Sequence, residues 1–478
     1  MMADVLSDLF IDDQDYPATP VWLVSQDRLE AWRVDHAGTD ASWSQTADFN
    51  AGRGRVLLLP GSGGELSGVL AGLGGDKEET GRAYARQRVY CAVPALVPPG
   101  DYRIAGSPDP ETATHMALGW AMGCYGFARY KKPKSPAIPR LVLPQGVDGE
   151  AVRREAHAVW QVRDMINTPA NDMGPDALED ILVGMAARYE ASLSVTAGEA
   201  LLQQGFSLIH AVGAVGEQEP RLLDLTWGDE TAPQVTLVGK GVCFDSGGLD
   251  IKPASGMGLM KKDMGGAACV IALGEMIMAA QLPVRLRVLV PAVENGIGRG
   301  AMRPGDIITG RKGISVEVGN TDAEGRLILS DALALADEEE PDLLIDMATL
   351  TGAARVAMGP DITPFFTHDD VLADALLRHS GKTIDPLWRL PLWMPYARLL
   401  DSPVADMNNI SKGGFAGSIT AALFLCRFVE RAARYVHFDL YGWNPEASPG
   451  CPVGGEAQAI RALFSLLVER YGHEQTGY

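Results

Sequence analysis

The sequence lacks the short motifs that mark several common enzyme classes. It contains no H-E-x-x-H zinc motif, no G-x-x-x-x-G-K-[ST] phosphate loop and no G-x-S-x-G nucleophile elbow. No segment reaches about 18 uninterrupted apolar residues, so we expect no membrane-spanning helix. The first residues show no basic stretch followed by an apolar run, so we expect no secretory signal. These absences argue against a zincin, a P-loop nucleotidase, an α/β-hydrolase and a membrane protein.

Cysteine and positive charge are also scarce. The 478 residues include six scattered cysteines with no C-x-x-C pair, a pattern that favours reduced thiols in the cytoplasm over a disulfide framework. Forty-one Lys+Arg stand against 61 Asp+Glu, which gives a formal net charge of -20. Such a surface repels a phosphate backbone, so we expect no nucleic-acid partner. The hydrophobic fraction of 46% is that of a folded protein with a large core.

Apolar runs alternate with segments of helical periodicity along most of the chain, which predicts an α/β fold. The length suggests two or three domains. In the first part we expect strands at residues 21–24, 56–59 and 141–143 and a helix at 111–129. A charged helix at 148–166 would connect this part to the rest. We therefore expect an N-terminal α/β domain at 1–145, a connecting helix at 146–168 and a second domain at 169–478.

The second part repeats a strand, loop and helix rhythm. The expected strands are 235–238, 284–290, 314–318, 343–347 and 435–440. The expected helices are 264–280, 327–338 and 456–469. The segment 264–280 is apolar almost all round, which indicates a helix packed on several sides.

Three loops place charged residues where strands are expected to end: residues 238–253, 260–266 and 318–327. In open α/β sheets, ligands bind outside the carboxyl ends of the strands, so we expect these loops to meet. Asp322, Glu324 and Arg326 alternate, and an extended segment would project them to one side. A solvated acidic turn is the alternative reading of this D-x-E segment taken alone. Asp245 and Asp263 bring the carboxylates to four, enough to neutralise two divalent ions.

The third loop carries a family signature. Residues 320–327 read Asn-Thr-Asp-Ala-Glu-Gly-Arg-Leu, the octapeptide of the leucine (cytosol) aminopeptidase family without a substitution. Residues 346–353 and 413–421 extend the resemblance, which runs from about residue 167 to the C-terminus; residues 1–145 match less clearly. The resemblance implies a dinuclear metallo-aminopeptidase whose catalytic domain has a central mixed β-sheet flanked by helices, preceded by a smaller α/β domain.

The resemblance also implies roles for individual residues. Asp245 and Glu324 would bridge two metal ions, Lys240 and Asp263 would complete the tightly held site, and Asp322 would complete the exchangeable one. A metal-bound Lys240 must be neutral, because an ammonium has no lone pair to donate. The ions would be Mn²⁺ or Zn²⁺, with Mg²⁺ or Co²⁺ as further candidates for an oxygen-rich cage.

Two cationic residues would then face the substrate. Lys252 would contact the carbonyl oxygen that becomes negative in the transition state. Arg326 would hold a bicarbonate ion that acts as general base. The free α-amine of a peptide would bind the exchangeable metal, which restricts cleavage to the first peptide bond.

The resemblance assigns a pocket for the first substrate residue to Met260, Thr349 and Gly352, and one for the second to Asn320 and Ala323. Near the C-terminus the sequence departs from the small pair that the family commonly has, because Tyr441 stands there. A tyrosine ring in the pocket would fill space that leucine needs or offer a hydroxyl to a polar side chain. Alternatively, Tyr441 points into the core.

The family further implies peptide substrates with a free N-terminus, a cytoplasmic location and a homohexamer assembled with the help of the N-terminal domain. Two other functions stay open on the same fold: a DNA-binding or regulatory assembly, and a non-catalytic oligomeric scaffold. Chelation that abolishes activity, with recovery on adding metal, would separate an enzyme from either alternative.

Overall fold

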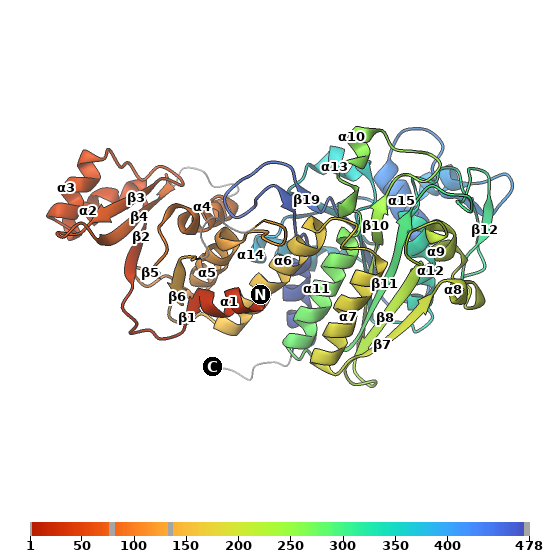
Figure 1. The fold of residues 1–478 in the computed structure, drawn as a ribbon, viewed down its shortest axis with the longest axis horizontal. Helices are drawn as coiled ribbons and strands as arrows, with labels where there is room; N and C mark the ends of the chain where they lie inside the picture. Colours follow the sequence, from red (N-terminus) through yellow and green to blue (C-terminus); the bar gives the residue numbers. More distant parts are fainter. Residues whose placement is uncertain (1, 76–81, 132–136, 473–478) are drawn as a thin grey trace. The chain divides into compact units, whose positions relative to one another are not determined.

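The computed structural model describes residues 2–75, 82–131 and 137–472. The chain divides into two compact units, which are described separately: Met1–Trp160 with Glu446–Val453, and Gln161–Pro445 with Gly454–Tyr478 (Figure 1). Helix α6 (Gly149–Asn167) crosses the division. The expected boundaries after residues 145 and 168 stay predictions, and the grouping of Glu446–Val453 with the first unit has no signal in the sequence. None of the described helices is both long enough and apolar enough to span a bilayer.

The first unit is built on a mixed sheet. Within the described residues the strand order is β1-β6-β5-β2-β4-β3, and only the β3–β4 pair is antiparallel. The strands are β1 (Phe10–Ile11), β2 (Thr19–Ser25), β3 (Val56–Pro60), β4 (Leu66–Gly74), β5 (Asp101–Ile104) and β6 (Arg140–Val142). The helices are α1 (Met2–Leu9), η1 (Gln26–Arg28), α2 (Leu29–Asp35), α3 (Thr39–Thr46), α4 (Arg82–Leu96) and α5 (Pro110–Cys124).

The second unit contains a larger mixed sheet. Among the described residues its order is β16-β15-β18-β14-β9-β11-β8-β7, with β10 paired to β11. These strands are β7 (Ser192–Ala197), β8 (Arg221–Trp227), β9 (Gln234–Gly239), β10 (Gly241–Asp245), β11 (Arg285–Asn295), β14 (Leu343–Ala348), β15 (Thr363–Phe366), β16 (Leu387–Arg389) and β18 (Tyr435–Asp439). Smaller sheets pair β12 (Ile307–Thr309), β13 (Ser315–Glu317) and β17 (Met407–Asn408), and β19 (Trp443–Asn444) with β20 (Gly454–Gly455).

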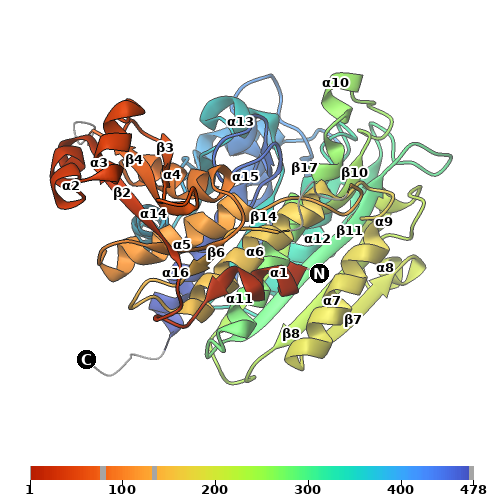
Figure 2. The same ribbon diagram turned by 60° about the vertical axis from the view of Figure 1, so that its left-hand side comes forward.

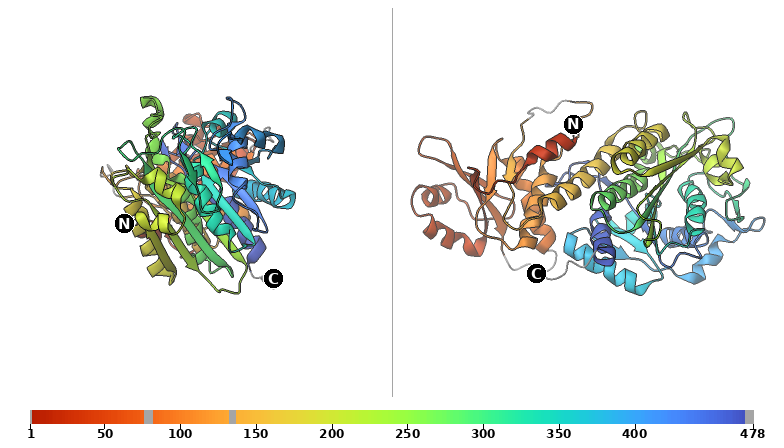
Figure 3. Two further views of the ribbon diagram at one scale, coloured as in Figure 1. Left: turned by 90° about the vertical axis from the view of Figure 1, so that its right-hand side faces the viewer. Right: turned by 90° about the horizontal axis from the view of Figure 1, so that it is seen from below.

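The central strands β18, β14, β9 and β11 run parallel, and helices cover both faces of the sheet (Figures 2 and 3). The helices are α7 (Pro175–Tyr189), α8 (Glu199–Gln203), α9 (Ser207–Gly213), α10 (Ala254–Met257), η2 (Met260–Lys262), α11 (Gly265–Ala279), α12 (Gly325–Asp337), α13 (Gly352–Met358), α14 (Asp370–Thr383), η3 (Met394–Leu400), α15 (Gly417–Cys426) and α16 (Ile460–Tyr471). Alternate residues of β11 show the two faces, because Val288 lies beside Gly274 of α11 while Leu289 packs in the core that includes α9, α12 and α15. The predicted α/β class is confirmed.

Helix α11 matches its expected environment closely. Every residue from Gly265 to Met278 is buried, as the apolar sequence indicates. Its first turn lies against β14 so tightly that a Cβ on Gly266 would sit 2.0 Å from the carbonyl oxygen of Met347. Only glycine permits this approach, which brings the start of α11 to the carboxyl end of β14.

Two expected helices have different ends. The helix expected at 111–129 ends at Cys124, where Tyr125 turns extended. The helix expected at 456–469 begins only at Ile460, because its first backbone N–H groups are capped by a residue distant in sequence. The Asp385 carboxylate accepts from the N–H groups of Ala459 and Arg461, both at 3.1 Å.

Candidate metal centre

The three charged loops of the second unit meet around one cavity of about 280 Å³. The parallel strands explain the convergence, because Lys240 directly follows β9, Asp245 ends β10, and Thr349 directly follows β14. Asp263 lies between η2 and α11, while Asp322 and Glu324 precede α12. The cavity lining includes all five predicted metal ligands together with Lys252: Lys240, Asp245, Asp263, Asp322 and Glu324.

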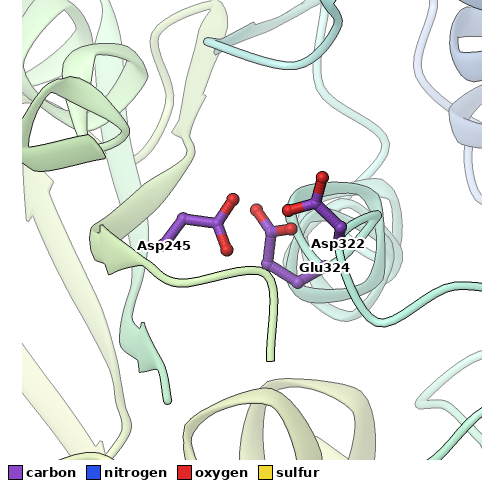
Figure 4. A group of neighbouring side chains, drawn as sticks. All are labelled: Asp245, Asp322 and Glu324. Atoms are coloured by element: carbon purple, nitrogen blue, oxygen red, sulfur yellow. The ribbon is translucent and has the colours of Figure 1, made fainter. Parts of the chain in front are cut away.

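The carboxylates lie close enough to share an ion. Oxygen atoms of Asp245, Asp322 and Glu324 all lie within 4.8 Å of one another. Figure 4 shows the three side chains pointing toward one another from β10 and from the segment before α12. Four acidic side chains, three of them buried, therefore share one cavity. Their mutual repulsion requires positive charge between them.

Two lysines supply positive charge at the points between the carboxylates. Nζ of Lys240 lies 2.8 Å from Oδ2 of Asp263 and 2.9 Å from Oε1 of Glu324, and it donates to the carbonyl oxygen of Thr349 at 3.1 Å. Nζ of Lys252 lies 2.8 Å from Oδ2 of Asp245 and also pairs with Asp322. Each ammonium thus joins two carboxylates that come from different loops.

Neighbouring groups hold the carboxylates in position. Asp245 accepts from the Asn295 side-chain amide at 2.7 Å and from the backbone N–H of Gly247 at 2.9 Å. Asp263 accepts from the Thr349 hydroxyl at 2.9 Å. Among the described residues, no hydrogen-bond donor reaches Oε2 of Glu324, although this oxygen is buried. An unpaired buried oxygen of this kind is costly unless another group, such as a metal ion, binds it.

The electrostatics of the cavity follow from burial and crowding. Burial and the charge of Asp263 raise the pKa of Asp245 to about 6. Burial and the charge of Asp245 raise the pKa of Glu324 to about 8. Burial opposes the positive charge of Lys240, but attraction to Asp263 and Glu324 outweighs it and holds the Lys240 pKa above its ordinary value. These shifts mark a site whose acidic groups are poorly compensated by the protein alone.

The sequence predicted an extended segment in which Asp322, Glu324 and Arg326 alternate. The segment before α12 is not extended, so this expectation is wrong. Thr321 and Asp322 form a turn, in which the Asp322 backbone N–H donates to the Asn320 side chain at 2.7 Å. Helix α12 then begins at Gly325. The turn aims Asp322 and Glu324 into the cavity even though alternation does not place them there.

Arg326 does not line the cavity. Its guanidinium donates to the Asn409 carbonyl oxygen at 2.7 Å, and its buried Nε has no hydrogen-bond partner in the ranges described. Burial lowers its pKa to about 10.

The predicted pocket residues fall into two groups. Met260, Thr349, Gly352 and Tyr441 all line the cavity beside the carboxylates. The lining drawn from the described residues does not include Asn320 or Ala323.

Tyr441 lies on the cavity wall rather than in the core. Its backbone N–H and that of Gly442 donate to the Gln458 side chain at 3.0 and 2.8 Å, which fixes the loop after β18. The residue therefore contributes to the wall of the cavity.

The sequence pattern missed three residues of this site. Lys262 and Arg355 also line the cavity, and burial lowers the pKa of Lys262 to about 8. Asp439 holds the loop after β14, because it accepts from the backbone N–H groups of Leu350 and Thr351 at 3.1 and 3.0 Å and from the Thr351 hydroxyl at 2.6 Å. The Lys-Lys-Asp run at 261–263 was a visible signal, but periodicity does not tell which lysine points inward.

Comparisons with known proteins show which family this chain is similar to. Residues 160–464 match the cytosol aminopeptidase family, catalytic domain, and residues 19–144 match the M17 aminopeptidase, N-terminal domain. A Syntrophotalea carbinolica protein named "Probable cytosol aminopeptidase" is 38% identical over 455 residues, which cover 91% of this chain and 90% of that protein.

Solved structures share the fold over nearly the whole chain. The cytosol aminopeptidase from Coxiella burnetii has a TM-score of 0.92 and 44% identity and covers 97% of this chain and 100% of its own. The bottromycin maturation enzyme BotP in complex with Mn has a TM-score of 0.85 and 32% identity, with coverage of 95% and 99%. The chain therefore belongs to the cytosol aminopeptidase family.

Proposed function

We propose that this chain, a metal-dependent aminopeptidase by its family, hydrolyses the first bond of peptides in the cavity around Asp245, Asp322 and Glu324. The observation that carries the proposal is the approach of these carboxylate oxygens to within 4.8 Å of one another. Two divalent ions would be held by these three residues with Lys240 and Asp263. Asp245 and Glu324 would contact both ions, and Asp322 the more exchangeable one.

The chemistry of the donor set fits such ions. Four carboxylates balance two divalent charges, and one buried Glu324 oxygen has no other partner in the described chain. Lys240 already lies between Asp263 and Glu324, and cations beside it would favour its neutral amine, which has a lone pair to donate. Oxygen and nitrogen ligands suit Mn²⁺ and Zn²⁺ and also accept Mg²⁺ or Co²⁺. BotP, which is similar to this chain, was solved in complex with Mn.

Divalent ions bound here would polarise the substrate carbonyl and lower the pKa of a coordinated water toward neutrality. Lys252 would donate a hydrogen bond to the carbonyl oxygen as that oxygen becomes negative in the transition state. Its position between Asp245 and Asp322, only partly buried, supports this role, because the ammonium faces the same space as the acidic cluster.

Arg326 is not among the residues that line the cavity, but the resemblance assigns it to a bicarbonate ion that would accept the proton of the attacking water. The buried guanidinium supports an anion site, because its Nε finds no partner within the described residues while Nη1 is held by Asn409. The buried charge also needs a counter-ion, which bicarbonate supplies.

The pocket for the first substrate residue would be formed by Met260, Thr349, Gly352 and Tyr441, which line the cavity together. Asn320 and Ala323, which are not among the described residues that line this cavity, would contact the second substrate residue. The word cytosol in the names of the family and its relatives supports a cytoplasmic location, and the homohexamer that the resemblance implies stays a prediction.

The test is hydrolysis of leucyl and methionyl dipeptides by the full chain before and after chelation. Activity should disappear with the metal and return with Mn²⁺ or Zn²⁺, and N-acetylated versions of the same peptides should resist cleavage. Lys252→Ala and Asp322→Asn should fold normally and lose most of their turnover. Equal cleavage of blocked and free peptides would contradict recognition of the free amine, and full activity of the chelated protein would contradict the metal site.

A further inference from the structure

Lys262 is a buried cation that the proposed reaction does not use. Its side chain lines the cavity, and the residue is 6% exposed. Within the part of the chain that the structure describes, its ammonium forms no ion pair and no hydrogen bond, while its backbone N–H donates to the Leu259 carbonyl oxygen at 2.9 Å. Its ammonium lies 5.2 Å from the centre of the Tyr441 ring. A ring face compensates a buried ammonium far less than its lost hydration costs, so the lysine needs another partner.

Arg355 is a second cation that contacts the ring of Tyr441. Its guanidinium carbon lies 5.3 Å from the Tyr441 ring centre, and the residue also lines the cavity. No carboxylate of the described residues pairs with it in an ion pair. Tyr441 is thus flanked by two cations at the wall where the first substrate residue would lie.

Within the described residues neither cation has a carboxylate at ion-pair distance. Lys262 is buried and feels only the longer-range attraction of Asp263 and Asp439, whereas Arg355 is exposed to solvent. The four carboxylates would be balanced by the two divalent ions of the proposed function, and Lys252 would face the reacting carbonyl. Lys262 and Arg355 then remain as positive charges beside the ring of Tyr441. A carboxylate on the substrate is the group that complements them.

We propose that the pocket selects peptides whose first residue is acidic, with Lys262 as the main specificity residue and Arg355 as the second. This inference rests on the proposed function, since it concerns the first residue removed by the same site. Glutamate and aspartate differ from glutamine and asparagine mainly in charge, so each acid and its amide form a matched pair of substrates.

The experiment measures kcat/KM of the metal-loaded protein for dipeptides that differ only in the first residue. One matched pair begins with Glu or Gln, and the other begins with Asp or Asn. For the wild type, kcat/KM should be at least about tenfold higher with first-position Glu than with Gln, and with Asp than with Asn, a difference of about 1.4 kcal/mol. Lys262→Met should reduce that ratio about tenfold, and Lys262→Glu should shift the preference toward first-position lysine. Lys261→Met is the control, because Nζ of Lys261 donates to the Asn167 carbonyl oxygen at 2.6 Å, and it should leave the ratio unchanged.

A binding measurement provides a readout apart from turnover. Titration calorimetry should show free L-glutamate binding the wild type more tightly than L-glutamine, with the difference lost in Lys262→Met. Equal kcat/KM for the acid and the amide in the wild type, with normal cleavage of leucyl peptides, would overturn the inference and leave the aminopeptidase intact. Absence of cleavage for every first residue would instead contradict the proposed function.

Discussion

Gly325 is the residue whose replacement tests the arrangement of the site most sharply. It is the first residue of α12, and a Cβ there would lie 2.5 Å from Cε and 2.7 Å from Nζ of Lys240. Ordinary carbon contacts are about 3.5–4.0 Å, so Lys240 has to move by about 1 Å or more. Its ammonium is fixed by Asp263 at 2.8 Å and by Glu324 at 2.9 Å, so it cannot move and keep both contacts.

The expected energies follow from these contacts. Breaking a buried ion pair costs about 3–5 kcal/mol, whereas alanine in place of glycine in a helix gains about 0.5–1 kcal/mol. Gly325→Ala should therefore lower the free energy of unfolding by about 2–4 kcal/mol. Metal affinity should fall at least about tenfold, because a proposed ligand is displaced.

Urea unfolding of the metal-free protein, in which Lys240 forms both ion pairs, and metal titration of kcat/KM measure the two effects. Gly184→Ala is the matched control, because Gly184 lies inside α7 with open space where a Cβ would project. It should leave activity unchanged and raise stability by up to about 1 kcal/mol. If Gly325→Ala has the metal affinity and stability of Gly184→Ala, the position of Lys240 in the site is wrong.

Three further predictions concern buried charges near the sheet. Asp346→Asn should lower the free energy of unfolding by about 3–5 kcal/mol. The reason is that Asp346 lies 2.7 Å from Nδ1 of His437 and accepts from the Tyr435 hydroxyl at 2.6 Å. A loss below about 1 kcal/mol would contradict this prediction. Burial opposes the His437 charge, but Asp346 raises the His437 pKa, so this stabilisation is complete below pH about 6.5 and is lost as pH rises through the folded-state value. The stability difference between wild type and Asp346→Asn should accordingly shrink from pH 6 to pH 9, and a constant difference would refute the assignment. Arg326→Met should lower kcat about 100-fold and abolish any response to added bicarbonate, whereas an unchanged response would exclude the anion site.

The sequence predicted the parts of the fold that depend on local pattern. The observed ends of β14 and α11 are close to the expected ones, because both segments are almost entirely apolar, which predicts burial on all sides. The start of α16 could not be predicted, since Asp385 caps it from a distant position. The length of β11 was also underestimated, because the strand continues beyond residue 290 through Pro291.

The same distinction holds for the site. The expected strand ends and the signature octapeptide predicted that the acidic residues meet, and they line one cavity. The turn at Asp322, rather than alternation along an extended segment, directs Asp322 and Glu324 into it. The Lys-Lys-Asp run did not tell which lysine faces the cavity, and Arg355 carried no signal, because the importance of both residues arises from the side chains that they face. The spacing of residues along the chain does not predict which side chains face one another across a cavity.

Anomalous scattering from crystals grown with Mn²⁺ tests the central claim most directly. We expect two ions in the cavity, with Asp245 and Glu324 bound to both, Lys240 and Asp263 to one and Asp322 to the other. Ions found away from these side chains, or a cavity without ions at saturating Mn²⁺, would contradict the account.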